Sequence, residues 1–193
     1  MLRKEERHKA IAIPVSFTEG KPRFLTVKDR RFKEWIFVTG GCHRREVHNP
    51  LKCALRELEE ETRGVVNIEQ GTYSEFVLTC KNHSPEDINK DKKDGVEVTL
   101  IYHIFVIDYN VPRSRQIDQI RRFDEAKHRM DERKRNKLPI KKTYDENDAM
   151  SYDTLEEFSR KKKWDFITKS VLENPDFLVA LNTLNRKRFS LRS

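Results

Sequence analysis

The stretch Gly40–Val66, GGCHRREVHNPLKCALRELEEETRGVV, decides the fold of this 193-residue chain. Asn49 is a favourable N-cap, and Pro50 suits the first helical position because an N–H there would have no helical partner. The apolar residues that follow recur at i, i+3, i+4 and i+7, and they are Leu51, Ala54, Leu55 and Leu58. The sequence therefore predicts one amphipathic helix that Gly64 ends.

Three glutamates lie on a different face of this helix. Glu57, Glu60 and Glu61 occupy positions i, i+3 and i+4, where exposed like charges repel by a few tenths of a kcal/mol per pair, roughly. A hard divalent cation would turn this repulsion into coordination. The alternative is a solvated acidic face, with nearby arginines as counter-ions. The glycine pair that precedes the helix favours the metal interpretation, because such a loop lets backbone N–H groups approach phosphate.

This stretch resembles the box of the Nudix hydrolase family, G-x5-E-x7-R-E-U-x-E-E-x-G-U, where U is a bulky aliphatic residue. The core of the box, Arg56-Glu57-Leu58-x-Glu60-Glu61, matches fully. The flanks differ. Counted from Gly41, Arg56 comes one residue late, and Glu46, which matches the first glutamate, is separated from it by nine residues instead of seven. Arg63 is an insertion before the glycine that ends the box. The resemblance covers about 10–158, including FLTVKDRRFKEWIFVTGG before the box and ENDAMSYDTLEEF after it.

The resemblance implies a fold and a reaction. The fold is α+β, an α-β-α sandwich with a mixed central sheet between helices, in a single domain over residues 1–193 with the box at 40–66. The reaction is hydrolysis of a diphosphate bond with Mg²⁺ or Mn²⁺, and the cations would polarise the diphosphate and activate water. The enzyme would use Glu60, Glu61, Arg56 and Glu146 in catalysis, and the metal ligands would be Glu57, Glu60 and Glu61.

Two further roles follow from the same resemblance. Arg56 would hold the glutamates by charge-assisted hydrogen bonds, without touching substrate. An additional acidic group would come from the loop before the last strand, where Glu146 and Asp148 are both candidates, and the identity of the general base stays open. Phosphate would contact the glycine pair and the basic turn, which together contain Gly40, Gly41, Arg30, Arg31 and Lys33.

Alternation of apolar and polar residues predicts the strands. They are Ala10–Phe17, Phe24–Val27, Glu34–Thr39, Tyr73–Cys80, Val96–Tyr109 and Ala149–Tyr152. Pro14 indicates an edge strand or a bulge, whereas Val96–Tyr109 is apolar on both faces and should be central. Residues 81–94 lack apolar periodicity and predict a loop. Helices follow at about 155–185, with a break at Asn174-Pro175.

An inserted segment at about 112–142 carries nearly all of the net charge. Between Arg113 and Lys142, 12 Lys and Arg stand against 5 Asp and Glu, which gives 12 − 5 = +7 of the chain's +8. A thin apolar seam of Ile117, Ile120, Phe123 and Met130 predicts a long charged helix or a helical pair. We expect its basic side chains to follow an RNA backbone, and they are Arg121, Arg122, Lys127, Arg129, Arg133, Lys134, Arg135 and Lys137. A solvated helix with internal ion pairs is the alternative.

A capped mRNA would suit both the diphosphate chemistry and the basic insertion. More weakly, the chain is similar to the mRNA-decapping Nudix enzymes of large DNA viruses, which would release m7GDP and 5′-monophosphate RNA. Phe32, Trp35 and Tyr73 are candidate partners for the methylated base, although a core position is favoured for each. Two alternatives stay open: a hydrolase of small nucleotide or inositol pyrophosphates, and an inactive Nudix-like module that binds RNA or protein.

Composition excludes other classes of protein. No run of about 18 apolar residues predicts a membrane span, and the N-terminus MLRKEERHK lacks the apolar segment of a secretory signal. Cys42, Cys53 and Cys80 form no CxxC pair, which predicts reduced thiols in an intracellular, cytoplasmic protein, in the host cytoplasm if the source is viral. The oligomeric state is left open.

Overall fold

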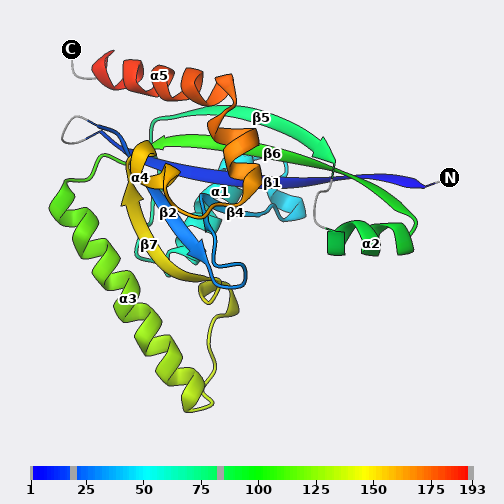
Figure 1. The fold of residues 1–193 in the computed structure, drawn as a ribbon, viewed down its shortest axis with the longest axis horizontal. Helices are drawn as coiled ribbons and strands as arrows, with labels where there is room; N and C mark the ends of the chain where they lie inside the picture. The colour runs from blue at the N-terminus through cyan, green and yellow to red at the C-terminus, as the bar shows by residue number, and fades with distance from the viewer. Residues whose placement is uncertain (1, 18–20, 82–84, 191–193) are drawn as a thin grey trace.

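The computed structural model describes residues 2–17, 21–81 and 85–190, and the centre of that part of the chain is a mixed sheet of seven strands. The order is β3-β2-β1-β6-β5, with β4 also paired to β1 and β7 to β2 (Figure 1). The parallel pair is β1 with β6, and the other pairs are antiparallel. The strands are β1 (Arg3–Ser16), β2 (Arg23–Asp29), β3 (Trp35–Ile36), β4 (Val38–Gly41), β5 (Tyr73–Lys81), β6 (Val96–Asp108) and β7 (Asn147–Asp153).

Helices cover both faces of the sheet. The α-helices are α1 (Pro50–Glu61), α2 (Pro85–Lys93), α3 (Arg113–Arg135), α4 (Leu155–Ser159) and α5 (Pro175–Ser190). Short 3-10 turns η1 (Arg44–Glu46) and η2 (Lys142–Tyr144) and a π-helix, η3 (Ile167–Leu172), complete the described elements. Side chains of α1 and α3 join the core on one face, and those of α4, η3 and α5 join the core on the other. The expected α-β-α sandwich is confirmed.

Strand β6 separates the two cores. Tyr102, Ile104 and Val106 are buried under α5 and η3, whereas Phe105 and Ile107 are buried on the face that α1 covers. Alternate side chains of a strand point to opposite faces, so the uninterrupted buried apolar run at 104–107 suits a strand covered on both sides. The central placement predicted for this segment is confirmed.

The expectation that Pro14 marks an edge or a bulge is wrong. Strand β1 lies inside the sheet, and Pro14 is paired in register with Ile107 of β6. On the opposite side, β1 pairs with β4 through Lys9–Ala12 and with β2 only from Val15 onward. Pro14 therefore lies between the residues of β1 that pair with β4 and those that pair with β2. Its missing N–H is tolerated because no ladder hydrogen bond to β4 or β2 is formed at this position.

Two other segments differ from the sequence prediction. The strand expected at Glu34–Thr39 is two strands, β3 and β4, because Trp35–Ile36 pairs with β2 while β4 crosses to β1. The loop expected at 81–94 contains α2, and residues 82–84 of it lie outside the described residues. Helix α2 is held through a buried carboxylate, Asp91, which accepts an ion pair from Arg7 at 3.0 Å. A helix anchored by a charge lacks the apolar stripe that sequence periodicity detects.

The basic insertion forms one helix, α3, and not a helical pair. Phe123 is fully buried and Met130 nearly so, but Ile117 is 56% exposed, so the predicted apolar seam is wrong at that position. Gln116 and Gln119 are buried in its place, and Gln119 connects the hydroxyls of Tyr109 and Tyr152 by hydrogen bonds. The Gln116 amide donates to the carbonyl of Val111 and accepts from Arg113, so both buried amides have partners and this part of the seam is polar.

The cysteines also differ from expectation. Cys42, directly after β4, forms a disulfide with Cys53 of α1, and among the described residues Cys80 is the free cysteine. Eleven residues of chain separate the pair, so a rule based on CxxC spacing misses it. The pairing contradicts the prediction of three reduced thiols and removes that argument for an intracellular location. Among the described helices, none combines the length and the hydropathy needed to cross a bilayer.

The C-terminal region agrees with its prediction. Thr154 caps α4 in a capping box with Glu157, and the break at Asn174-Pro175 separates η3 from α5 (Figure 1). Phe158, Ile167 and Phe177 from these three elements are buried together over the sheet.

We predict that the Phe123 side chain fixes α3 to the body of the protein. Phe123→Ala should lower the free energy of unfolding by about 3 kcal/mol or more, because it leaves a cavity in the core. Ile117→Ala, on the same helix, should change it by less than about 0.5 kcal/mol, because Ile117 is exposed. Urea denaturation of both variants measures the difference, and equal costs would contradict the docking of α3.

Candidate active site

Helix α1 packs its apolar side chains on the sheet and turns the box carboxylates to another side. The side chain of Asn49 accepts a hydrogen bond from the backbone N–H of Lys52, and Pro50 begins the helix as predicted. Cys53, Ala54 and Leu58 are buried against the sheet. The opposite side of α1 is thereby turned toward β4 and the loop before β7.

Arg56 is the centre of an ion-pair network. Its Nε and Nη2 donate to the two carboxylate oxygens of Glu46 at 2.8 and 2.9 Å. Its Nη1 donates to Glu57 at 2.7 Å and to Glu60 at 3.2 Å, and Nη2 also donates to the carbonyl of Gly41 at 3.0 Å. The hydrogen bonds from Arg56 lower the pKa of Glu46 to about 2, although burial opposes the shift. The position of Glu46 agrees with its match to the first box glutamate despite the longer spacing.

Gly40 has a different local role from the one expected. It lies within β4, and a Cβ atom at this position would be only 1.9 Å from Cδ of Glu57. A larger residue at position 40 would therefore force the Glu57 carboxylate away from the backbone on which it rests. Nothing lies within 4 Å of a Cβ built on Gly41, whose carbonyl holds Arg56. A contact of these two glycines with phosphate stays a prediction.

Glu61 is the most deeply buried carboxylate of the box. It is 4% exposed and accepts a hydrogen bond from the Asn147 amide at 3.1 Å. Burial raises the pKa of Glu61 well above its ordinary value, Asn147 opposes the shift, and the charges of Glu57 and Glu146 add to it. Burial also raises the pKa of Glu146 and of Glu57, and repulsion from neighbouring glutamates adds to both shifts. At Glu57, the Arg56 guanidinium opposes the shift.

These carboxylates supply the chemistry that a divalent cation needs. Glu57, Glu60, Glu61 and Glu146 are hard oxygen donors that repel one another, and a cation would relieve that repulsion. Among the described residues, however, no three acidic, histidine or cysteine side chains converge on one point. Glu57 and Glu60 are turned onto Arg56, and Glu60 also pairs with Lys141 at 3.4 Å. The donor set fits a metal, and its side chains would need to rotate to hold one.

The structure separates the two acidic candidates of the loop before β7. Glu146 is close enough to Glu57 and Glu60 for their charges to raise its pKa. Asp148 instead accepts ion pairs from Arg30 at 3.0 Å and from Lys33, and their hydrogen bonds lower its pKa although burial raises it. Glu146 is thus the acidic group that joins the box carboxylates.

The basic turn after β2 is used mainly within the protein. Arg30 pairs with Asp145, and its backbone N–H donates to the carbonyl of Glu146 at 2.9 Å. Arg31 points elsewhere and pairs with Glu86 of α2 at 2.9 Å. Of the three predicted phosphate ligands, the structure brings Arg30 and Lys33 to the loop that carries Glu146, and it does not bring Arg31 there.

Three residues of this site escaped sequence reasoning. Asn147 holds Glu61, Tyr144 donates its hydroxyl to Glu59 at 2.8 Å, and Lys141 pairs with Glu60. They follow the basic insertion and lie about 80 residues beyond the box, so no spacing rule connects them to it. The position of Asn147 inside ENDAM, which the family resemblance covers, was the available signal.

The inserted Arg63 of the box is buried between α1, α3 and β7. It has a positive φ of 56°, its guanidinium stacks on Phe123 at 4.1 Å, and it donates to the backbone carbonyl of Asn147. Burial, and then repulsion from Arg30, lowers the pKa of Arg63 to about 10. Arg63 thus connects α1, which carries the box glutamates, to the basic helix α3.

The eight basic residues expected to follow RNA, seven on α3 and Lys137 just after it, divide into two groups. Lys127 and Lys134 turn inward to Asp148 and Asp145, Arg121 pairs with Asp118 and Glu125 within the helix, and Arg133 caps the carbonyl of Pro139. Four others are exposed and have no ion pair among the described residues, and they are Arg122, Arg129, Arg135 and Lys137.

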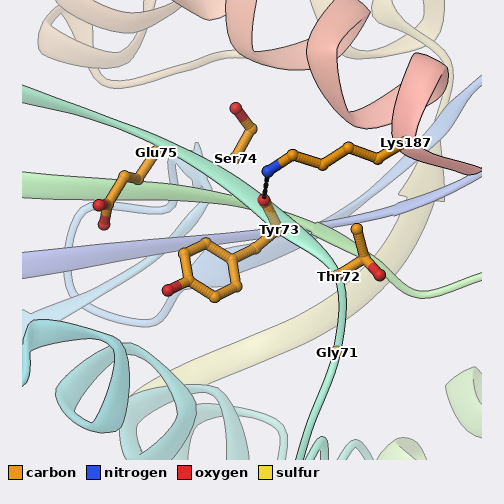
Figure 2. A pocket seen from close by; sticks show the side chains of 6 residues that line it. All are labelled: Gly71, Thr72, Tyr73, Ser74, Glu75 and Lys187. Carbon is orange, nitrogen blue, oxygen red and sulfur yellow. Dashed lines mark hydrogen bonds between the residues drawn. The ribbon is translucent and has the colours of Figure 1, made fainter.

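A pocket of about 530 Å³ opens far from this chemistry. It is lined by Gly71–Glu75 at the start of β5 and by Lys187 of α5, whose Nζ donates to the carbonyl of Tyr73 at 2.9 Å (Figure 2). No box carboxylate lines it. The shape of the surface alone therefore does not locate the candidate site, which rests on its charged groups.

The raised pKa of Glu61 predicts that this residue destabilises the fold near pH 7. Between the ordinary and the raised pKa, the folded protein binds more protons than the unfolded chain, so stability falls as pH rises through that window. Glu61→Gln should therefore raise the melting temperature in EDTA at pH 7 by about 2–4 °C per kcal/mol gained, and the gain should vanish below about pH 4.5.

Thermal unfolding at several pH values measures this effect. Glu69→Gln, which changes an exposed carboxylate, is the matched control and should have no effect. A Glu61→Gln variant no more stable than the wild type at pH 7 would contradict the prediction.

Comparison with known proteins agrees with this geometry. The model of the NUDIX domain family matches residues 6–167. A Nudix hydrolase from Listeria monocytogenes has a similar structure, with a TM-score of 0.54, 15% identity, and coverage of 94% of this chain and 95% of that one. The NUDIX domain of Shewanella oneidensis NrtR in complex with ADP ribose gives a TM-score of 0.48 at 10% identity, covering 97% and 89% of the two chains. The Ap4A hydrolase of C. elegans gives 0.43 at 15% identity, covering 98% and 100%. Among curated proteins no sequence matches significantly. This chain belongs to the Nudix family and is a hydrolase of diphosphate bonds.

Proposed function

We propose that this Nudix hydrolase uses Mg²⁺ or Mn²⁺ to cleave the cap of RNA, releasing m7GDP and 5′-monophosphate RNA. The observation that carries the proposal is the row of exposed, unpaired basic side chains on α3. Arg122 and Arg129 are seven residues apart, so they lie on one side of the helix about 10 Å apart, a spacing that a nucleic-acid backbone can match. Arg135 and Lys137 continue the basic surface beyond them.

The basic helix is rigidly attached to the catalytic side of the protein. Lys127 and Lys134 of α3 pair with Asp148 and Asp145, the acidic residues that flank Glu146 and Asn147. A strand bound along the outer side of α3 would therefore be held in a fixed relation to the carboxylates. A dinucleoside polyphosphate needs no such extended surface, which favours capped RNA over that small substrate, whereas an inositol pyrophosphate would also need basic side chains.

The roles proposed for the box are those that the family resemblance implies. Glu57, Glu60 and Glu61 would hold the cation, which supplies polarisation of the diphosphate and activation of water when bound. Arg56 does not reach outward, because its donors are taken by Glu46, the box glutamates and Gly41, so it positions those groups. Glu146, with its raised pKa, is the additional carboxylate at the site.

Among the three aromatic candidates for the methylated base, Phe32 is the exposed one, and the Arg31 guanidinium lies over its ring at 4.9 Å from the centroid. Phe32 is 59% exposed, contrary to the favoured core position, and lies in the turn whose Arg30 hydrogen-bonds the carbonyl of Glu146. Trp35 is covered by the Lys161 ammonium at 3.4 Å, and Tyr73 packs against Phe105. A cationic m7G ring can stack on an exposed aromatic face, so we assign the cap contact to Phe32.

The decapping proposal predicts a charge effect confined to α3. Replacing Arg122, Arg129 and Arg135 together by Gln should raise KM for cap-labelled RNA by about tenfold or more and flatten its salt dependence by about 2 in log–log slope. Lys90, Lys92 and Lys93 on α2, at the far end of the molecule, provide a charge-matched control whose replacement should have little effect (Figure 1). Release of m7GDP at several salt concentrations is the measurement.

Absence of m7GDP release by the wild type would reject decapping, and a panel of nucleotide and inositol pyrophosphates would then identify a small substrate.

The cap contact predicts discrimination by Phe32. Phe32→Ala should raise KM for m7G-capped RNA by about fivefold, because a cation–π contact of about 1 kcal/mol is lost, and should leave KM for unmethylated G-capped RNA unchanged. Phe32→Trp should preserve the preference. An equal effect of Phe32→Ala on both caps would assign base recognition to another residue.

A further inference from the structure

We propose that Lys141 binds a phosphate of the substrate. Without a cation, Lys141 is paired with Glu60, and a divalent cation that binds Glu60 releases the Lys141 side chain to contact the diphosphate. The inference rests on the diphosphate hydrolysis of the Nudix family and not on the identity of the substrate, so it holds for capped RNA and for a small pyrophosphate alike.

The geometry places Lys141 beside the box from outside the box. It lies at the end of the insertion, directly before η2, and its Nζ is 3.4 Å from Oε1 of Glu60. The ammonium also lies over the Tyr144 ring, 4.2 Å from the centroid. Tyr144 is fixed in turn by its hydrogen bond to Glu59, at 2.8 Å. The Lys141 ammonium is therefore held by the Tyr144 ring and by Glu60, which is a proposed metal ligand.

The two cations that contact Glu60 differ in freedom. Arg56 is fixed by Glu46 on one side and by Gly41 on the other, so it stays in place whatever binds the glutamates. The Lys141 side chain is 51% exposed and sits on a flexible four-carbon stem. A divalent cation and the Lys141 ammonium compete for the same carboxylate, so the mobile group is the one displaced.

The displaced ammonium needs a new anion close by. Two nearby carboxylates are already occupied, because Asp145 pairs with Arg30 and Lys134, and Asp148 pairs with Lys33. Glu59, whose charge also acts on Lys141, accepts the Tyr144 hydroxyl and offers a single negative charge. A diphosphate at the box offers more negative charge than Glu59, and an ammonium with three N–H donors is a good phosphate ligand. Lys141 would thus contact substrate only when the cation has arrived.

This exchange predicts opposite changes in metal affinity and substrate affinity. Lys141→Ala should bind Mn²⁺ about two- to fivefold more tightly in EPR titrations of the EDTA-stripped protein, because the competing charge is removed. The same variant should show KM for the diphosphate substrate raised by about tenfold or more, with kcat within about threefold of the wild type. Lys141→Arg, which keeps the charge, should restore KM.

Lys142→Ala is the matched control. Lys142 is the exposed neighbour and has no ion pair among the described residues, so both readouts should be unchanged. Weaker Mn²⁺ binding together with a lower kcat in Lys141→Ala would show a purely structural role and overturn the proposal, as would unchanged Mn²⁺ affinity. The Mn²⁺ titration needs no substrate, and KM is measured with capped RNA or, if that is not cleaved, with ADP-ribose or Ap4A. Failure of decapping is thereby separated from failure of the Lys141 assignment.

Discussion

The Arg56 guanidinium is the group on which the candidate site depends. It joins the loop before α1, through Glu46 and the Gly41 carbonyl, to the glutamates of α1. Several carboxylates can gather in one partly buried place only if a fixed cation offsets their repulsion. Arg56 lowers the pKa of Glu46, whereas burial raises the pKa values of Glu57, Glu61 and Glu146, so a bound cation would favour the ionised forms of these three groups.

A second set of ion pairs attaches the basic insertion to this centre. Asp145 and Asp148 accept pairs from β2's basic turn on one side and from α3 on the other. Arg63 adds a buried link through Phe123 and the carbonyl of Asn147. Arg30 and Lys127, two basic residues that the sequence offers as ligands of phosphate or RNA, thereby hold the architecture together. Arg122, Arg129 and Arg135 of α3 stay exposed and have no ion pair among the described residues.

Sequence reasoning worked where the signal is local. The cap and apolar stripe of α1, the double-sided apolar run of β6 and the box core are fixed by neighbours within a few turns of chain, and all of them are found as predicted. Sequence reasoning failed where the local structure depends on contacts between residues that are far apart in the sequence. The tolerance of Pro14, the charge-anchored α2 and the Cys42–Cys53 disulfide each depend on partners that periodicity and spacing do not show.

The sequence by itself determined the family and the reaction class through the match of its box. It also placed the carboxylates of the box together, because a 3.6-residue period puts Glu57, Glu60 and Glu61 on one side of a helix wherever that helix lies. Only the tertiary structure decided which charges remain available. It brings Glu146 near the box glutamates, pairs Asp148 with Lys33 and brings Lys141 to Glu60, because an ion pair depends on distance in space and not along the chain.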